Sequence, residues 1–322
     1  MLAPRGLQTD EFYKLNFTGS AAVFFFYVIS GFLISFTLHA NYTATPAGIT
    51  AFWRARFARI FSLYWPALAV SVLLFAGPAI GWFDRLVQVI LFGMDWRLTF
   101  GSYPLAYWQA VPPGIPQAWT LGAELTFYLV APWLARSRIA IAVALAASLV
   151  LRAWLLATMQ PPPDVWIYHF APATFCFFMI GCAAFHLGER VAELRRPWFG
   201  LLAVAASLAI MAMGRPTGGI DEGRVWASLA FFAIGLPGFF AATKDWRVSN
   251  LLGDLSYPVY IVHYMVLLAF GAAIFGAMPG LASIAPFLAA VVIVAALSHW
   301  LVEMPVSRLF SERRRRPAPQ AP

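Results

Sequence analysis

Long runs of apolar residues, separated by short polar and charged stretches, dominate the pattern along the chain. Several runs approach the roughly 20 residues that an α-helix needs to cross the hydrocarbon core of a bilayer. Within the runs, polar and apolar residues do not alternate as they would in the strands of a membrane β-barrel. The pattern therefore predicts an all-α, polytopic transmembrane helical bundle. The nine predicted spans cover residues 20–39, 60–80, 117–135, 139–158, 169–188, 197–213, 224–242, 256–276 and 281–303.

The remaining segments are not expected to form separate folded units. Residues 82–93, GWFDRLVQVILF, are too short and too charged for a span, so we place them at the membrane interface or as a re-entrant piece. One membrane domain is expected to cover residues 1–310. The basic, proline-rich residues 311–322 cannot bury a core. We expect them to form a disordered cytoplasmic tail that lies along anionic lipid headgroups.

Composition and charge support a lipid environment. The chain is 61% hydrophobic and only 11% charged, whereas a soluble domain has roughly a quarter of its residues charged. Its net charge of +8 could indicate nucleic-acid binding. However, Lys and Arg fall in short clusters between apolar runs, which is typical of the cytoplasmic loops of membrane proteins. We therefore expect membrane lipids, and no nucleic acid, as partners.

The basic clusters also predict the topology. Most Lys and Arg residues occur in alternate gaps between the predicted spans. These gaps hold RARFAR at 54–59, Arg136 and Arg138, Arg190 with Arg195 and Arg196, Lys244 with Arg247, and the C-terminal tail. The positive-inside rule places these gaps and the C-terminus in the cytoplasm. Nine spans then leave the N-terminus outside without a secretion signal, so we expect a further helix to precede Met1.

Glu124 is the most informative ionisable residue inside a span. An ionised side chain at the bilayer centre costs about 2.5–3.5 kcal/mol on insertion scales. In QAWTLGAELTFYLVAPWL, Thr120 and Tyr128 lie four residues to either side of Glu124, on the same helical face. This polar face should point into the bundle. Glu124 is therefore a candidate functional carboxylate, although a carboxylate that only links neighbouring helices would give the same pattern.

A second polar stripe occurs in LGDLSYPVYIVHYMV. Ser256, Tyr260 and His263 have the i, i+4, i+7 spacing of one helical face. Pro258 suits the first turn of this helix, where no N–H bond is lost. His263 could relay protons or bind a substrate hydroxyl. Equally, it could be a neutral imidazole satisfied by a tyrosine or a backbone carbonyl.

Two further charged groups have specific spacings. Arg56 and Arg59, in FWRARFARIFSLYWP, share one helical face. They could bind the phosphates of a nucleotide-like cofactor, but their spacing alone favours anchoring of the loop in lipid headgroups. His299 and Glu303, at i and i+4 in SHWLVEMP, are expected to form a structural hydrogen-bonded pair.

Small residues complete the pattern. Ser30 and Gly31 interrupt the apolar run FFFYVISGFLI, and would let either a helix or a ligand approach the backbone closely. Cys176 and Cys182 lie inside one apolar segment, which fits neither a disulfide framework nor a thiolate metal site. We expect both cysteines to be packing residues, and we expect no metal.

Five stretches, in this order, resemble the integral-membrane acyltransferase-3 family, whose members O-acylate glycans and other exported molecules. They are AAVFFFYVISGFLIS, RARFARIFSLYWP, AWTLGAELTFYLVAP, LGDLSYPVYIVH and LVEMPVSR. The resemblance implies ten helices in the inner (plasma) membrane. It also implies transfer of an acyl group, most often acetyl, from acyl-coenzyme A to a hydroxyl of a carbohydrate or lipid-linked glycan.

The resemblance assigns roles to residues at matching positions. Arg56 and Arg59 match an arginine pair associated with the acyl donor, which replaces the anchoring interpretation. Glu124 and His263 match polar positions near the membrane cavity and are the catalytic candidates. The substrate-binding candidates on the same two segments are Tyr128, Ser256, Tyr257 and Tyr260.

The chain departs from the family pattern at its start. Family members open with a helix that carries an Arg and, further on, a His regarded as the catalytic base. No residue before Ser20 matches that His, and His39 lies at the wrong end of the next span. This departure agrees with the helix expected before Met1.

A different functional class remains open. In a proton-coupled secondary transporter or flippase, Glu124 and His263 would bind protons or substrate near mid-membrane. Such proteins often show paired repeats and helices broken by Gly or Pro, which we do not find here. A fragment without its first helix could also be an inert scaffold.

Overall fold

The computed structural model describes residues 9–75, 115–159, 165–213, 222–277 and 280–306. Within these ranges the chain is helical and contains no strand, so the predicted all-α fold class is confirmed. The longer helices are α1 (Thr9–Asn41), α2 (Pro46–Phe75), α6 (Trp119–Leu134), α7 (Arg138–Thr158), α8 (Ala171–Arg190), α9 (Pro197–Ala212), α10 (Glu222–Thr243), α11 (Arg247–Ala277) and α12 (Ile284–Ser298). Short turns of 3-10 helix form at Pro116–Ala118, Ala192–Arg195 and Gly280–Ser283, and π-helical turns form at Val165–His169 and His299–Glu303.

Each of the nine predicted spans overlaps one of these helices. Among the described residues, 6 segments are long and apolar enough to cross a membrane. They are Ala21–Asn41, Arg138–Thr158, Trp166–Arg190, Gly223–Thr243, Arg247–Gly271 and Ile284–Val306. The polytopic character is therefore confirmed. The predicted interfacial segment at 82–93 and the tail at 311–322 lie outside the described residues.

One predicted helix boundary is wrong. The polar stripe was expected near the start of a helix at residue 256, with Pro258 in the first turn. Instead α11 begins at Arg247, so Pro258 lies inside the helix. Proline lacks an N–H and leaves the carbonyl four residues earlier without its helical partner. That carbonyl belongs to Asp254, which is exposed, so solvent can replace the missing bond.

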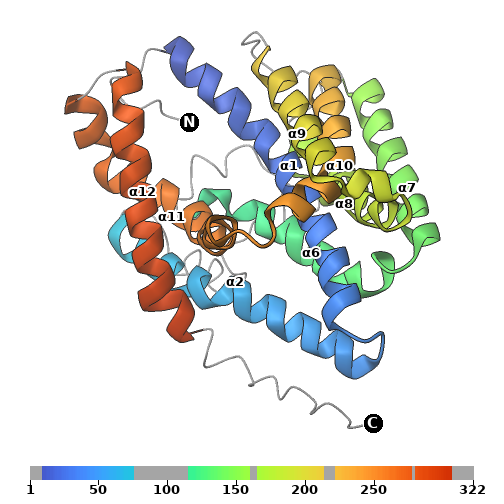
Figure 1. The fold of residues 1–322 in the computed structure, drawn as a ribbon. Helices are drawn as coiled ribbons and strands as arrows, with labels where there is room; N and C mark the ends of the chain where they lie inside the picture. Colours follow the sequence, from blue (N-terminus) through green and yellow to red (C-terminus); the bar gives the residue numbers. More distant parts are fainter. Residues whose placement is uncertain (1–8, 76–114, 160–164, 214–221, 278–279, 307–322) are drawn as a thin grey trace.

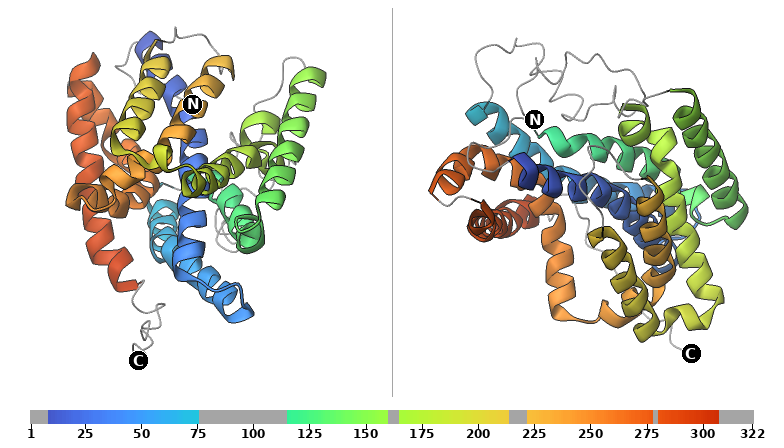
Figure 2. Two further views of the ribbon diagram at one scale, coloured as in Figure 1. Left: turned by 45° about the vertical axis from the view of Figure 1, so that its right-hand side comes forward. Right: turned by 90° about the horizontal axis from the view of Figure 1, so that it is seen from above.

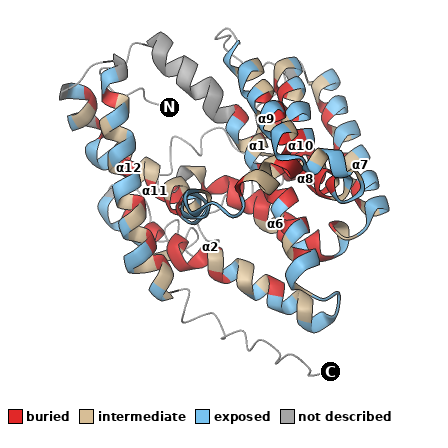
Figure 3. Cartoon of the chain, in the orientation of Figure 1, coloured by how far each residue is buried: buried red, intermediate tan, exposed pale blue. Residues whose placement is uncertain are grey.

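The helices pack as neighbouring pairs around α1 and α8 (Figures 1 and 2). α9 packs along α10, while α8 contacts α1, α6, α7 and α10. On the other side, α11 packs against α12 and α2. Buried residues concentrate where α1, α6 and α8 meet, whereas α7 and α12 present many exposed side chains (Figure 3). The polar side chains inside this central region are therefore the best candidates for function.

Glycine explains the close approach of α1 and α8. A Cβ on Gly31 of α1 would lie 2.0 Å from the carbonyl oxygen of Phe178, and a Cβ on Gly181 of α8 would lie 2.0 Å from the carbonyl oxygen of Val28. Neither position can accept a side chain unless the helices move apart. Of the two alternatives for the small residues at 30–31, helix packing is thus the role of Gly31. The contact therefore fixes the position of Ser30 along α8.

Aromatic rings and a buried arginine fill the space beside this contact. Phe24 of α1 stacks on Phe177 of α8 with ring centroids 4.1 Å apart. The guanidinium of Arg152, on α7, lies 5.3 Å from the centroid of each ring. It also donates a hydrogen bond to the carbonyl oxygen of Ile167 at 2.5 Å. Cation–π contacts and this hydrogen bond stabilise a cation that is only 2% exposed.

Candidate functional site

Glu124 lies inside the bundle, as the spacing of its polar neighbours predicted. It is 6% exposed, and Thr120 and Tyr128 on the same face of α6 are also buried. The Glu124 Oε1 atom accepts a hydrogen bond from Ser30 Oγ at 3.1 Å and a second, short one from the Tyr128 hydroxyl. The carboxylate is therefore oriented by one side chain from α1 and one from its own helix.

Arg56 and Arg59 belong to α2, which packs against α6 and holds it through a hydrogen bond from Trp53 Nε1 to the Tyr128 carbonyl oxygen at 3.0 Å. Arg56 is partly buried, with its carbon Cζ 5.8 Å from the ring centroid of Phe52. Its Nε atom is buried and has no hydrogen-bond partner among the described residues. Arg56 thus keeps a buried donor that an anionic ligand could use.

Arg59 connects this site to the end of the described chain. Its Nη1 atom lies 3.3 Å from Glu303 Oε1, and its Nη2 atom donates to the carbonyl oxygen of Gly253 at 3.3 Å. Glu303 is 2% exposed and also contacts His299, with Nδ1 2.7 Å from Oε2. The predicted His299 and Glu303 pair is therefore confirmed. Sequence reasoning missed the contact with Arg59, because the i, i+4 spacing already gave Glu303 a partner.

The start of α6 is held against α11 by a second set of polar contacts. The Tyr260 hydroxyl makes short hydrogen bonds with the Thr120 hydroxyl and the Gln117 carbonyl. In return, Gln117 Nε2 donates to the carbonyl oxygens of Tyr260 at 3.0 Å and Ile261 at 2.9 Å. Gln117 was not among the predicted site residues, although it directly precedes the AWT sequence. Its role here is to fix α11 relative to α6.

The other residues predicted on α11 occupy different environments. The Tyr257 hydroxyl donates to the carbonyl oxygen of Ile60 on α2 at 2.5 Å. Ser256 is exposed and donates to the Gly253 carbonyl of its own helix at 2.8 Å. His263 Nδ1 lies 2.7 Å from the Tyr260 carbonyl oxygen, also within α11. Within the described ranges, neither Ser256 nor His263 contacts Glu124.

The structure thus joins Glu124 to Tyr128 on α6 and packs α6 against α2, the helix of Arg56 and Arg59. It places Tyr257 and Tyr260 at the contacts between α11 and its neighbours. This arrangement combines a buried, oriented hydrogen-bond acceptor with two cations that can bind an anion. In the part of the chain that the structure describes, no group of three or more His, Cys, Asp or Glu side chains could hold a metal ion. Cys176 and Cys182 are buried and free.

Two similar proteins carry names that describe acyl transfer. The peptidoglycan O-acetyltransferase OatA of Listeria monocytogenes is 22% identical over 331 residues, which cover 92% of this chain and 53% of the relative. The acyltransferase MdmB of Streptomyces mycarofaciens is 26% identical over 348 residues, which cover 94% of this chain and 84% of the relative. The chain thus spans about half the length of the Listeria protein. No solved structure matches the chain.

A protein family described as an acyltransferase domain matches residues 3–302, nearly the whole chain. This match includes all the helices that carry the cluster around Glu124, and it confirms the family that the five sequence stretches indicated. The chain is a member of the integral-membrane acyltransferase-3 family.

Proposed function

We propose that the protein is a membrane O-acyltransferase that moves an acyl group, with acetyl as the first candidate, from acyl-coenzyme A to a hydroxyl of a glycan or another exported acceptor. Family membership supports the reaction class, and the name of the Listeria relative supports an O-acetyl product on a glycan. The observation that carries the proposal is the buried Glu124 carboxylate, which accepts hydrogen bonds from Ser30 and Tyr128, on a helix that packs against the helix of Arg56 and Arg59.

Arg56 and Arg59 are assigned to the donor. Coenzyme A carries phosphate groups, and the planar guanidinium group suits their recognition through paired hydrogen bonds. The side chain of Arg59 is 37% exposed, so it can reach a soluble ligand while it remains paired with Glu303. The positive-inside rule places the start of α2 and the C-terminus on the cytoplasmic side of the inner membrane, where acyl-coenzyme A is available.

Glu124 is assigned to the acceptor side. In the proposed reaction the acceptor oxygen attacks the thioester carbonyl carbon, the carbon–sulfur bond breaks, and coenzyme A leaves as the thiol with the proton that the acceptor loses. The oriented Glu124 carboxylate can accept the hydrogen bond of the attacking hydroxyl or take its proton. General-base assistance of this kind contributes about 10²–10⁴-fold to a rate. We assign His263 as the second catalytic candidate, and Tyr128, Ser256, Tyr257 and Tyr260 to the surrounding substrate site.

The test measures acyl transfer in membranes that contain the protein. Membranes are incubated with radiolabelled acetyl-coenzyme A and candidate glycans, and label in the glycan is counted. We expect labelling that depends on the protein, and an increase in the KM for acetyl-coenzyme A in the Arg56→Ala, Arg59→Ala variant. The matched control is Lys244→Ala, Arg247→Ala, which removes two exposed cations elsewhere.

Two results would contradict the proposal. One is label that does not depend on the protein. The other is a KM for acetyl-coenzyme A that responds equally to both double variants, which would indicate a general charge effect. Movement of the acceptor across vesicles in the absence of coenzyme A would instead favour the transporter or flippase alternative.

A further inference from the structure

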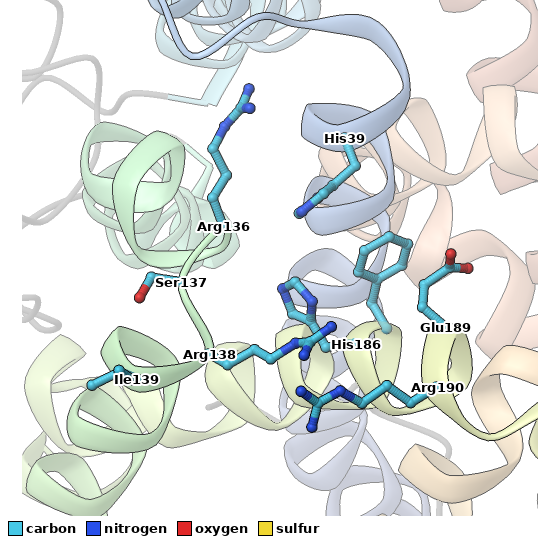
Figure 4. A pocket seen from close by; sticks show the side chains of 9 residues that line it. His39, Arg136, Ser137, Arg138, Ile139, His186, Glu189 and Arg190 are labelled. Carbon is cyan, nitrogen blue, oxygen red and sulfur yellow. The ribbon is translucent and has the colours of Figure 1, made fainter.

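A surface recess of about 710 Å³ lies away from the Glu124 site, where the ends of α1, α6, α7 and α8 meet. Figure 4 shows side chains from these elements around it. Arg136 Nη2 holds the end of α1 through the carbonyl oxygens of Leu38 at 3.1 Å and Tyr42 at 2.7 Å. His186 Nε2 lies 2.8 Å from the carbonyl oxygen of Ala135. The walls of the recess are therefore fixed by contacts between helices.

The recess has more cations than the surrounding protein neutralises. Arg138 at the start of α7 and Arg190 at the end of α8 extend toward the same space beside His186 (Figure 4). Neither arginine has a carboxylate partner among the described residues. The one carboxylate in the lining, Glu189, lies 3.2 Å from Arg195 Nη1, outside the recess lining. Two converging, unpaired guanidinium groups form a site that favours a phosphate anion.

Helix α7 adds two features that point to the source of that phosphate. Its N-terminus, at Arg138, opens into the recess, where the helix dipole favours negative charge. From the same end, exposed apolar side chains run along one face of α7. These are Ile139, Val143, Val150 and Trp154, with exposed fractions of 78%, 63%, 70% and 56%. Ile139 itself lines the recess, so the basic site continues directly into a surface suited to lipid chains.

We propose that this recess binds the phosphate group of an anionic phospholipid, with the guanidinium groups of Arg138 and Arg190 on the phosphate and an acyl chain along the α7 stripe. The phosphate itself could also come from a soluble ion or cofactor, which would have no use for the apolar stripe. Basic recesses between transmembrane helices at the cytoplasmic side are suited to anionic headgroups. The positive-inside rule places this recess at that side, because Arg136, Arg138 and Arg190 belong to the arginine-rich gaps.

The experiment compares lipid binding by the purified full chain in detergent, measured by native mass spectrometry. The probes are dioleoyl phosphatidylglycerol, dioleoyl phosphatidylcholine and inorganic phosphate. We expect phosphatidylglycerol to bind at least about tenfold more tightly than phosphatidylcholine, because the choline cation of phosphatidylcholine offsets the charge of its phosphate and is repelled by the two guanidinium groups. Arg138→Gln, Arg190→Gln should remove this preference. The control Lys244→Gln, Arg247→Gln, which also removes two exposed positive charges, should keep it.

A further variant tests the contribution of the acyl chain. Ile139→Gln should weaken phosphatidylglycerol binding while Arg138 and Arg190 remain in place. Single Arg138→Gln and Arg190→Gln variants, each expected to reduce the lipid preference, keep the test decisive if the double variant does not fold.

Three outcomes would overturn the proposal. The first is equal loss of lipid preference in both double variants, which would indicate general electrostatics. The second is unchanged lipid preference in the Arg138 and Arg190 variants. The third is full competition by inorganic phosphate at the lipid concentration used, which would make this a site for a soluble phosphate.

Discussion

The cluster around Glu124 and the recess beside α7 both contain charged groups, but these groups differ in burial and in the partners that they have. In the interior, Glu124 accepts two hydrogen bonds and Glu303 contacts both Arg59 and His299. In the recess, Arg138 and Arg190 are exposed and converge with no partner carboxylate among the described residues. Burying an unpaired charge is far more costly than exposing one. Buried charges are therefore part of the fold, whereas exposed unpaired cations remain available to a ligand.

This difference implies that substitutions inside the bundle should change folding and activity, and that substitutions in the recess should change ligand binding. The predictions below test the distinction, beginning with the helix contact that positions the interior cluster.

Gly31→Ala should have the largest effect, because it separates α1 from α8 and moves Ser30 away from Glu124. The added Cβ would lie 2.0 Å from a backbone oxygen, which cannot move as a flexible side chain would. Overpacking of this kind costs about 1–3 kcal/mol, and more where backbone must shift. We expect a large decrease in the thermal unfolding midpoint in detergent. Gly276→Ala is the matched control, since a Cβ there meets nothing within 4 Å; equal effects would contradict the close-contact explanation.

Glu124→Gln should strongly reduce activity while it changes stability much less. The amide keeps the shape of the carboxylate and an oxygen that can accept from Ser30 and Tyr128, but it lacks the charge. We expect kcat/KM for acyl transfer to fall by about 10²-fold or more, the scale of a lost general base. Glu189→Gln, which changes an exposed carboxylate paired with Arg195, should leave transfer nearly unchanged. An unchanged kcat/KM for acyl transfer in Glu124→Gln would indicate that Glu124 only links helices and has no catalytic role.

Arg59→Gln should destabilise the protein, because the buried Glu303 would keep only His299 as a partner among the described residues. We expect a loss of about 1–2 kcal/mol, below the 3–5 kcal/mol typical of a fully buried pair, because the Arg59 side chain is 37% exposed. Combining it with Glu303→Gln in a double-mutant cycle should recover part of this loss. Strictly additive unfolding midpoints would show that the two side chains do not interact.

The contrast between the two regions also explains what the sequence could predict. Helix content and the inward face of Glu124 follow from local periodicity, since Thr120 and Tyr128 are its neighbours within one helix. The close partners of Glu303 and Tyr260 did not follow, because Arg59 and Gln117 lie more than 100 positions away along the chain. The recess was missed for the same reason: Arg138 and Arg190 appeared as separate loop cations. Only packing of α7 against α8 brings them to one site.

Arg138→Gln, Arg190→Gln should have the smallest effect on stability, and this is the direct counterpart of the Arg59 prediction. Exposed cations without a partner lose no favourable pairing when they are replaced, and their removal relieves repulsion between two like charges. Surface substitutions of this kind usually change stability within about 0.5 kcal/mol. We expect an unfolding midpoint in lipid-free detergent equal to or slightly above that of the unmodified protein. The difference between the two midpoints should decrease at high salt as screening increases. A large decrease in the unfolding midpoint would mean that both arginines have partners within the fold. The recess would then be part of the folded structure in the same sense as the Glu124 cluster.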